Sequence, residues 1–565
     1  MAETPAPNVT PNAAPETRPL RTAATVVVMR DSPTGIEVLL LRRAERGDHS
    51  SGAWVFPGGV LDAQDRDCAA FCGSLDDASA SASMGMTEGG LDYYVAAIRE
   101  CFEEAGLLLA CGSDGHLVSL AGELGTEMGH WRSRLHRGEA TMAQFCGQYG
   151  LTLATDRLAY FSRWVTPAIR AKRWDTRFFF AIAPTEQESA HDEVELVEQL
   201  WLKPAEAIAR SESLKLLNPT RYTLETLSGF ATTADMMAHA RTPRTVALAV
   251  PRIADGPEGM HPVGADHFAW SEVGKLDPQG HGTASYAIVP GRPVRLSDRV
   301  IRVTADNSGM MTGPGTNTYL VGGGPRNEWA VIDPGPSLAP HIEAILKAAP
   351  GPIRWILVTH THQDHSPAAN ELRERTGATV MGRIANYPQN QDPGFKPDRI
   401  LAHGERLTID QDTTLAVFHT PGHASNHLCY LLEQEQMLFT GDHVMQTSTV
   451  VIGPPDGDMT AYLDSLRALL AVPLTWFAPG HGFLMAQPHK ALEGIVAHRL
   501  RREAKVLDAV TELAGADTDA LLARVYDDVK PGLHPVARRS LTAHLQKLAA
   551  DGRVRHDNDH WTAIR

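Results

Sequence analysis

Short apolar runs recur along the chain, and each is followed by a turn or by a cluster of polar residues. Four such runs lie in its middle, at residues 329–332, 355–358, 415–418 and 437–439. Runs of this length, bounded by glycine, proline or polar residues, are typical of buried strands. Because backbones can converge at strand ends, we expect the turns after these runs to share a common site.

The pattern near the C-terminus is helical instead. Apolar residues recur at helical spacing over residues 498–513 and 535–549, with a shorter helix expected near 518–526. An Asp-Gly turn then leads into an alternating stretch, 554–564, that suits two short strands. Three helices followed by a hairpin predict a winged helix.

The N-terminal third begins with two strand-like runs, residues 24–29 and 38–41. A later helix places Glu100, Glu103 and Glu104 at positions i, i+3 and i+4, on one face. Three carboxylates so close would repel one another unless a cation lay between them. Hard oxygen ligands favour Mg²⁺ or Mn²⁺, so the face is a candidate metal site, with an ordinary solvated helix face as the alternative.

The length of 565 residues predicts several domains. The first residues are rich in Pro, Ala and Thr and lack the features of a secretory signal, which predicts a disordered tail. A later stretch rich in Pro, Gly and His predicts a linker. The expected parts are the tail at 1–20, an N-terminal domain at 21–235, the linker at 236–294, a central domain at 295–495 and the winged helix at 496–565.

Composition limits the partners and the compartment. The formal net charge of −15 argues against a generally nucleic-acid-binding surface, although a local basic patch stays open. No apolar run approaches the roughly 20 residues of a membrane span, so we expect no membrane partner. The six cysteines contain no CxxC pair, which fits a reducing compartment, and we expect a cytoplasmic protein.

The strongest chemical signal is the string THTHQDH, directly after the apolar run at 355–358. It contains His360, His362, Asp364 and His365, four side chains able to bind a metal within six positions. Imidazole nitrogens and carboxylate oxygens are the ligands that zinc accepts when no thiolate is offered. A cluster this dense suggests two metals rather than one.

Further polar residues follow other strand-like runs: Asp333, His423 in TPGH, Asp442 in TGD and His481 in APGHG. The whole pattern, D…HxHxDH…H…D…H, resembles that of the metallo-β-lactamase superfamily, and every position is filled. The resemblance implies an αββα sandwich around two metals, expected to be zinc, although iron or manganese would suit the same ligands.

The resemblance also implies a role for each residue. The first metal would be held by His360, His362 and His423, the second by Asp364, His365 and His481, with Asp442 bridging and with Asp333 and His427 in support. Two cations about 3.5–4 Å apart would lower the pKa of a shared water. The bridging hydroxide would attack the substrate, and Asp364 would serve as the catalytic residue that orients it.

Two strings in the N-terminal third, WVFPGG and RECFEEAGL, resemble the Nudix box, G-x5-E-x7-R-E-U-x-E-E-x-G-U. The resemblance implies an α/β/α sandwich in which the three glutamates bind Mg²⁺ or Mn²⁺, Arg99 orients them and Gly59 lies in the preceding loop. Its substrates would be nucleoside diphosphates or coenzyme A derivatives. Asp65 replaces the family's first glutamate and residues 66–98 replace a seven-residue spacer, so activity stays open.

Residues 300–565 resemble the metallo-β-lactamase subfamily that includes an endoribonuclease, through the patterns HRxxRE and LxxHLxKLxxxGxV. That likeness implies cleavage of an RNA phosphodiester, with basic side chains of the winged helix on the phosphates. The winged helix could instead brace the neighbouring domain or form one wall of its active-site cleft, and its many acidic residues favour this bracing role over nucleic-acid recognition. Two other functions stay open: hydrolysis of a thioester or ester, as in the glyoxalase II branch, and non-catalytic binding of a metabolite or nucleotide.

Overall fold

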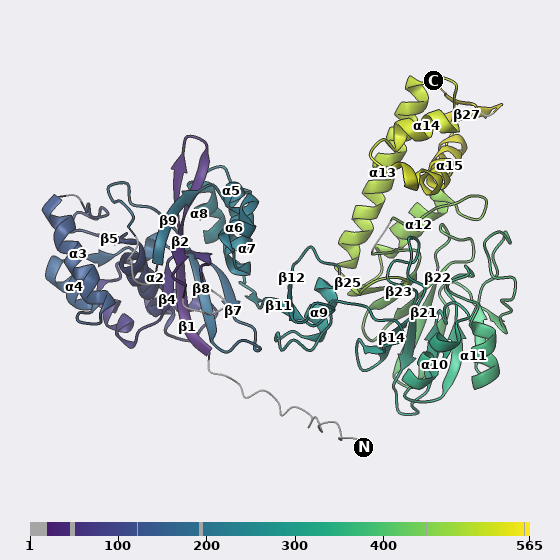
Figure 1. Cartoon of the computed structure of the whole chain (residues 1–565), viewed down its shortest axis with the longest axis horizontal. Helices are drawn as coiled ribbons and strands as arrows, with labels where there is room; N and C mark the ends of the chain where they lie inside the picture. The colour runs from purple at the N-terminus through teal and green to yellow at the C-terminus, as the bar shows by residue number, and fades with distance from the viewer. Residues whose placement is uncertain are drawn as a thin grey trace, which may run out of the picture. The chain divides into compact units, whose positions relative to one another are not determined.

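The computed structural model of the chain describes residues 20–45, 51–120, 122–190, 196–446, 449–558 and 560–564. Of the tail expected at 1–20, all but Leu20 lies outside these ranges. The chain divides into two compact units (Figure 1). The first runs to Pro251 and includes 279–281, and the second contains 252–278 and everything from Gly282 onward.

The first unit is built on a mixed sheet with the strand order β10-β7-β8-β1-β2-β3. β1 (Leu20–Ser32) and β2 (Gly35–Arg43) contain the two predicted strand-like runs and form a hairpin, and β1 pairs in parallel with β8 (Arg173–Ile182). β4 pairs with β1 and β9 with β2. The other strands of this sheet are β3 (Trp54–Val55), β4 (Gly58–Val60), β7 (Ala159–Val165), β9 (Leu196–Leu202) and β10 (Leu248–Ala249).

Side chains that alternate along β1 fill two cores, one on each face of this sheet. Val26 and Val28 pack with α2 (Gly90–Ala105), whereas Val27 and Met29 pack with the helices that follow β9. The sheet therefore lies between two helical layers, as the Nudix resemblance implied. The remaining helices are α1 (Asp77–Ser83), α3 (Gly122–His136), α4 (Met142–Tyr149), α5 (Pro204–Ala209), α6 (Ser211–Leu214), α7 (Asn218–Leu227) and α8 (Thr233–Arg241).

The second unit contains two sheets packed face to face. One has the order β13 to β19 and the other β20 to β25. Their facing side chains form one core, in which Tyr319 and Leu357 of the first sheet join Val417 and Phe439 of the second. The strands predicted from the four apolar runs are β16 (Trp329–Ile332), β17 (Ile353–Leu357), β21 (Thr413–His419) and β23 (Met437–Gly441).

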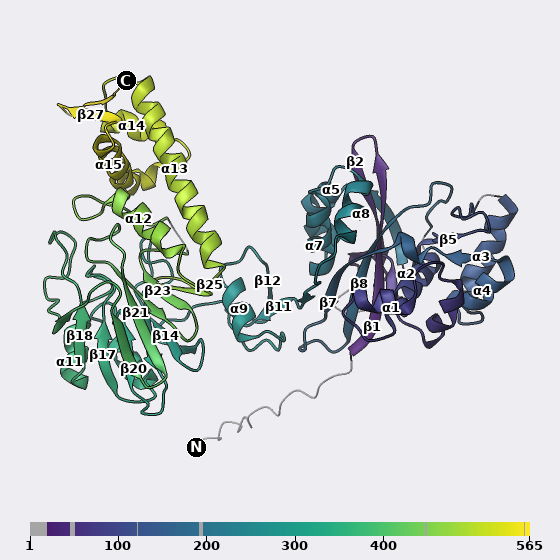
Figure 2. The same ribbon diagram turned by 180° about the vertical axis from the view of Figure 1, so that it is seen from behind.

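Helices cover both outer faces of this sandwich, which confirms the predicted αββα fold (Figure 2). α10 (Ala339–Ala348) and α11 (Ala369–Thr376) pack on the first sheet, and α12 (Met459–Leu469) packs on the second. The other strands are β13 (Val294–Arg295), β14 (Val300–Thr304), β15 (Asn317–Gly322), β18 (Thr379–Gly382), β19 (Arg399–Ile400), β20 (Arg406–Asp410), β22 (Leu428–Leu432), β24 (Trp476–Pro479) and β25 (Met485–Ala486).

The predicted winged helix is present. It consists of α13 (Pro488–Glu512), α14 (Thr518–Val525), α15 (His534–Ala550) and the strands β26 (Ala516–Asp517), β27 (Val554–Asp557) and β28 (His560–Ala563). α13 begins ten residues before the predicted start at 498 and crosses the expected domain bound at 495/496. The sandwich and the winged helix therefore share one continuous helix.

The expected linker, 236–294, contains ordered structure. α8 ends within it and β10 adds to the first sheet, whereas β11 (Arg252–Ala254), β12 (His261–Val263) and α9 (Trp270–Leu276) belong to the second unit. Val263 and Val273 of this segment share a small apolar core with Phe483 of the sandwich. Across the described ranges, no helix combines the length and the apolar character that crossing a bilayer requires.

Candidate metal centre

Every residue of the predicted metal motif follows a strand of the sandwich. Asp333 follows β16, the THTHQDH string follows β17, His423 follows β21, Asp442 follows β23 and His481 follows β24. These ends meet because β16, β17 and their partners are neighbours within one sheet, and Thr316 at the start of β15 bridges to His481 of the other sheet. The structure thus brings the seven predicted ligands together at one edge of the sandwich.

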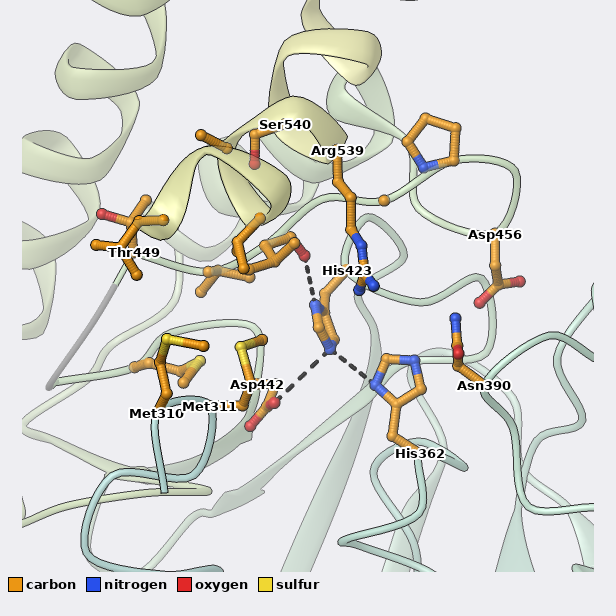
Figure 3. Close-up of a pocket in the computed structure, with 18 of the residues that line it drawn as sticks. Met310, Met311, His362, Asn390, His423, Asp442, Thr449, Asp456, Arg539 and Ser540 are labelled. Carbon is orange, nitrogen blue, oxygen red and sulfur yellow. Dashed lines mark hydrogen bonds and ion pairs between the residues drawn. The ribbon is translucent and has the colours of Figure 1, made fainter. Parts of the chain in front are cut away.

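Three histidines form the first part of the cluster. The Nδ1 atom of His362 lies 3.0 Å from the Nε2 atom of His423 (Figure 3). His360 completes a set whose potential ligand atoms all lie within 4.8 Å of one another. The Nδ1 atom of His423 is 2.7 Å from the carbonyl oxygen of Val451. That hydrogen bond uses the Nδ1–H group and leaves the Nε2 lone pair facing the cluster.

A second group contains Asp364, His365 and His481, whose ligand atoms also lie within 4.8 Å of one another. The Oδ2 atom of Asp364 is 3.4 Å from the Nε2 atoms of both histidines. Asp442 lies between the two groups. Its Oδ1 atom is 3.3 Å from His365 and 3.2 Å from His481, while its Oδ2 atom is 3.7 Å from His423.

Several of these atoms are buried without any hydrogen-bond partner among the described residues. They are the Nε2 atoms of His360, His365 and His481 and the Oδ1 atom of Asp442. Buried polar atoms are normally paired, because an unpaired one costs about 1–3 kcal/mol. Inward-facing imidazole lone pairs beside carboxylates are the donor set of a divalent cation, so these residues fit a metal site.

Two further residues hold the cluster in place. Asp333 accepts hydrogen bonds from the Thr359 amide and hydroxyl, both at 2.7 Å, and its Oδ2 atom lies 2.9 Å from the Nδ1 atom of His365. His427 is engaged at both nitrogens, since it lies 3.0 Å from the Thr420 hydroxyl and accepts from the Asp442 amide at 3.2 Å. Neither residue has an unpaired ring or carboxylate atom facing the cluster.

Burial and the neighbouring charges shift the pKa values of the cluster in two directions. Burial, with His423 nearby, lowers the pKa of His362 to about 3. Burial also opposes charge on His481, but Asp442 and Asp364 outweigh it and raise the pKa to about 9. Burial would raise the pKa of Asp442, yet His481 and His365 hold it well below its usual range. The carboxylates are therefore ionised and available as ligands.

A pocket of about 600 Å³ opens onto the cluster. Its floor contains His362, Asp364, His423 and Asp442, and its walls come from two sources (Figure 3). One wall is the loop segment 449–456 of the sandwich. The other belongs to the winged helix and includes residues of α13, the segment after α14, and α15; the residues are His498, Arg499, Arg502, Tyr526, Val529, Leu533, Val536, Ala537, Arg539 and Ser540.

The winged helix was expected as a possible wall of the cleft, but no pattern in the sequence indicated which residues of α15 would line the pocket. The rim residues Met310 and Met311 were also missed, and both are exposed apolar side chains, 68% and 45% accessible. Thr359 was missed as a support residue, although its place directly before the first ligand of the motif is a signal that could have identified it.

The Nudix-like site in the first unit has a different arrangement. Arg99 donates to both carboxylate oxygens of Asp65, at 2.8 and 3.1 Å, and to Glu100 at 2.8 Å, and it lies 3.5 Å from Glu103. Glu104 instead accepts from the Gly58 amide at 2.7 Å. The three glutamate side chains therefore do not point to one common metal position. In the described ranges, every group of three or more potential metal ligands lies in the second unit.

Gly59 lies directly against the Glu100 carboxylate. A Cβ atom there would lie 2.5 Å from that carboxylate, so any other residue at this position would require the Glu100 side chain to move. Burial raises the pKa of Glu100 to about 7, against the lowering effect of Arg99. The Arg99 guanidinium thus offsets only part of the cost of burying the Glu100 negative charge.

Family models match three parts of the chain. They are the metallo-beta-lactamase superfamily at residues 311–481, the NUDT19 Nudix domain at 71–227 and the beta-lactamase associated winged helix domain at 518–561. A beta-lactamase-like protein 2 homolog from Drosophila melanogaster is 30% identical over 48% of this chain and 94% of its own length. An atrochrysone carboxyl ACP thioesterase from Aspergillus fumigatus is 32% identical over 47% of this chain and 88% of its own.

Two solved structures are similar to separate parts of the chain. A NUDIX hydrolase from Alicyclobacillus acidocaldarius is 27% identical and covers 39% of this chain and 96% of its own, with a TM-score of 0.33. A beta-lactamase domain protein from Burkholderia ambifaria is 20% identical over 49% of this chain and 95% of its own, with a TM-score of 0.43. The domain models make the chain a hydrolase. It belongs to the metallo-β-lactamase superfamily, and it joins that domain to a preceding Nudix domain and a following winged helix.

Proposed function

We propose that the centre in the second unit binds two divalent cations and hydrolyses thioesters. His360, His362 and His423 would hold one cation and Asp364, His365 and His481 the other, with Asp442 between them. The Nε2 atoms of His360, His365 and His481 are buried and make no hydrogen bond to any residue that the structure describes, which supports this assignment, because buried nitrogens normally have a hydrogen-bond partner. Zinc is our first choice of metal, since nitrogen ligands outnumber oxygen ligands.

Divalent cations at such a site supply a water of lowered pKa as the nucleophile and polarise the carbonyl that it attacks. The protein's own residues do the rest. Asp364 lines the pocket floor with its side chain 26% exposed, so it can orient the water from the side that the substrate enters. Asp333 keeps His365 in one orientation and one tautomer, and His427 holds the backbone of Asp442.

The apolar wall of the pocket is the observation that carries the thioester proposal. Met310 and Met311 on the rim face a pocket that also contains Val450, Val536 and Ala537. Apolar side chains beside the catalytic floor favour an acyl chain over the charged backbone of a polynucleotide. Two of the similar proteins are named as acyl carrier protein thioesterases, which agrees with this choice.

RNA cleavage is less well supported, because two of the basic side chains of the winged helix, Lys547 and Arg538, are already paired with acids. Lys547 lies 3.1 Å from Glu503 and 2.7 Å from Asp551, and Arg538 pairs with Asp519. Paired cations release few counterions, so they add little to phosphate binding.

The test begins with metal analysis of the full chain and a panel of substrates: acyl-coenzyme A, acyl-N-acetylcysteamine, single-stranded RNA and a β-lactam. We expect about two divalent metals per chain in the second unit, with hydrolysis restricted to the thioesters. His423→Ala should lower the metal content and abolish turnover while the far-ultraviolet circular dichroism stays the same. Turnover of RNA but of no thioester would refute the proposal, as would full thioesterase activity in His423→Ala.

We also propose that the Nudix domain hydrolyses diphosphates with Mg²⁺ or Mn²⁺ held by Glu100 and Glu103, while Glu104 holds the Gly58 loop. The partly compensated Glu100 and Glu103 carboxylates, both with raised pKa values through burial, favour this role, because a divalent cation would offset their charge. The full chain should cleave nucleoside diphosphate or coenzyme A derivatives only when Mg²⁺ or Mn²⁺ is added, and Glu103→Gln should remove that activity. No cleavage of either class would leave the domain a binding module.

A further inference from the structure

Three arginines of the winged helix line the pocket, and two of them are already engaged. Arg499 is buried and donates to the carbonyl oxygen of Val450, so it holds the opposite wall. Arg502 donates to both carboxylate oxygens of Asp528, each at 2.9 Å. Arg539, on α15, is exposed and has neither a hydrogen bond nor an ion pair to any residue in the described ranges.

Arg539 projects from α15 into the pocket. Figure 3 shows its guanidinium over the catalytic floor, between His423 and Asp456. A Cβ atom on Gly453 would lie 3.5 Å from the Arg539 Cδ atom, so the side-chain stem runs along the loop wall at that glycine. The arginine thus carries its charge to the floor while its methylene groups pack on the wall.

Asp456, which is labelled on that side of His423, does not neutralise this charge. Its Oδ1 atom accepts from the Ser425 hydroxyl at 2.5 Å, and its Oδ2 atom lies 3.1 Å from both the Ser425 amide and the Gln391 side-chain nitrogen. Both oxygens are therefore used within the sandwich. The planar guanidinium keeps its donors free for a group that enters from solvent.

The two sides of the pocket also differ in character. Met310, Met311 and Thr449 lie on one side of His423 in Figure 3, and Asn390 and Asp456 lie on the other, below Arg539. A substrate that crosses the floor would therefore have an apolar end on the methionine side and a polar, charged end on the arginine side. A guanidinium without an internal partner selects a carboxylate or a phosphate for that charged end, since both fit its donors two at a time.

We infer that Arg539 is the specificity-determining residue of this site, and that the winged helix uses it to select thioesters that carry an anionic group. This inference rests on the proposed thioesterase function. The anion could be a carboxylate at the far end of the acyl group or a phosphate on the thiol arm. The chemistry at the arginine is the same in both cases, and substrates with one or the other anion separate them.

The experiment uses the full-length, metal-loaded protein and three substrates. These are an acyl-N-acetylcysteamine without charge, the same compound with a terminal carboxylate on the acyl chain, and the same acyl group on 4′-phosphopantetheine. Arg539→Gln should lower kcat/KM for one of the two anionic substrates by about 10- to 100-fold more than for the uncharged one, because a hydrogen bond to a charged group contributes about 1.5–3 kcal/mol. The loss should lie mainly in KM, and Arg539→Lys should restore part of it.

The control variant is Arg501→Gln, which removes the same charge from an exposed position on α13 that does not line the pocket. It should leave all three kcat/KM values unchanged. An equal loss for charged and uncharged substrates in Arg539→Gln, or no loss at all, would overturn the inference while leaving the thioesterase proposal intact. A wild-type protein that hydrolyses none of the three would refute the proposed function itself, and this inference with it.

Discussion

The substitution Glu272→Ala should destabilise the second unit by about 3–5 kcal/mol, because it leaves a buried charge without its partner. Glu272 lies on α9, within the segment that the sequence indicated only as a linker. Its carboxylate accepts from Arg302 at 2.6 and 2.9 Å and from the Leu484 amide at 2.8 Å. Both side chains of the ion pair are only 2% exposed.

After this substitution the Arg302 guanidinium would stay buried, with the carbonyl oxygen of Gly482 at 3.4 Å as its remaining hydrogen-bond acceptor in the described chain. The expected loss of stability comes from leaving the Arg302 charge buried without a partner. The intact ion pair itself contributes less than this, because desolvation of both groups offsets much of their attraction. The double variant Glu272→Leu with Arg302→Met removes both charges and keeps most of the volume. It should therefore recover most of the loss.

Differential scanning calorimetry of the full chain measures this effect on the transition of the second unit. A loss of about 3–5 kcal/mol should lower its Tm by roughly 5–10 °C for a unit of this size. Glu343→Ala removes a carboxylate from an exposed pair with Arg375, in which Glu343 is 64% exposed, and should change the Tm little. A Glu272→Ala protein that melts like the wild type would refute the reasoning, and so would a double variant less stable than the single one.

Three other outcomes follow from the two sites. In Asp333→Asn, the side chain at position 333 cannot accept from both Thr359 donors and from His365 together. Metal content and kcat/KM should therefore fall by about 10- to 100-fold, as measured by mass spectrometry of bound metal and by thioester turnover. Chelation should abolish turnover and lower the Tm of the second unit, because the cation binds only the folded state; an unchanged melting curve would contradict the metal assignment. Burial raises the pKa of Glu100 from 4.5 to about 7, so the folded first unit binds this proton more tightly than the unfolded chain, and its stability should fall between about pH 4.5 and 7. Melting curves in EDTA should show this slope in the wild type and a shallower one in Glu100→Gln.

The metal motif could be predicted from sequence because each part of it is local. Every candidate ligand follows its own apolar strand, and strand ends in stacked sheets approach one another without further information. The predicted strand at 329–332 coincides with β16. The helices expected at 518–526 and 535–549 begin and end within one residue of α14 and α15. Helix α13 begins ten residues before its predicted start, and this first part contains Gly494 and packs Leu492 against α12.

Contacts between distant segments had no such signal. The repulsion expected among the Nudix glutamates is relieved partly by Arg99, which the periodicity of one helix could not reveal, and Asp65 reaches that arginine across 34 residues. The pair of Glu272 and Arg302 spans 30 residues, and it converts a turn-rich stretch into part of a folded unit. Periodicity reports which face of an element is buried, and it does not report what lies against that face.

The shared helix α13 explains how a winged helix can act as part of an active site. Because α13 continues from β25 of the sandwich into the winged helix, the position of α15 is set by one rigid element and by the hydrogen bond from Arg499 to Val450. The metal ligands lie on loops of the sandwich, whereas Arg539 and the apolar residues around it lie on α15. Under the proposed function, the sandwich would carry the chemistry and α15 the substrate choice, with α13 joining the two. Substitutions on α15 should therefore change which thioester is hydrolysed without moving any residue of the metal centre.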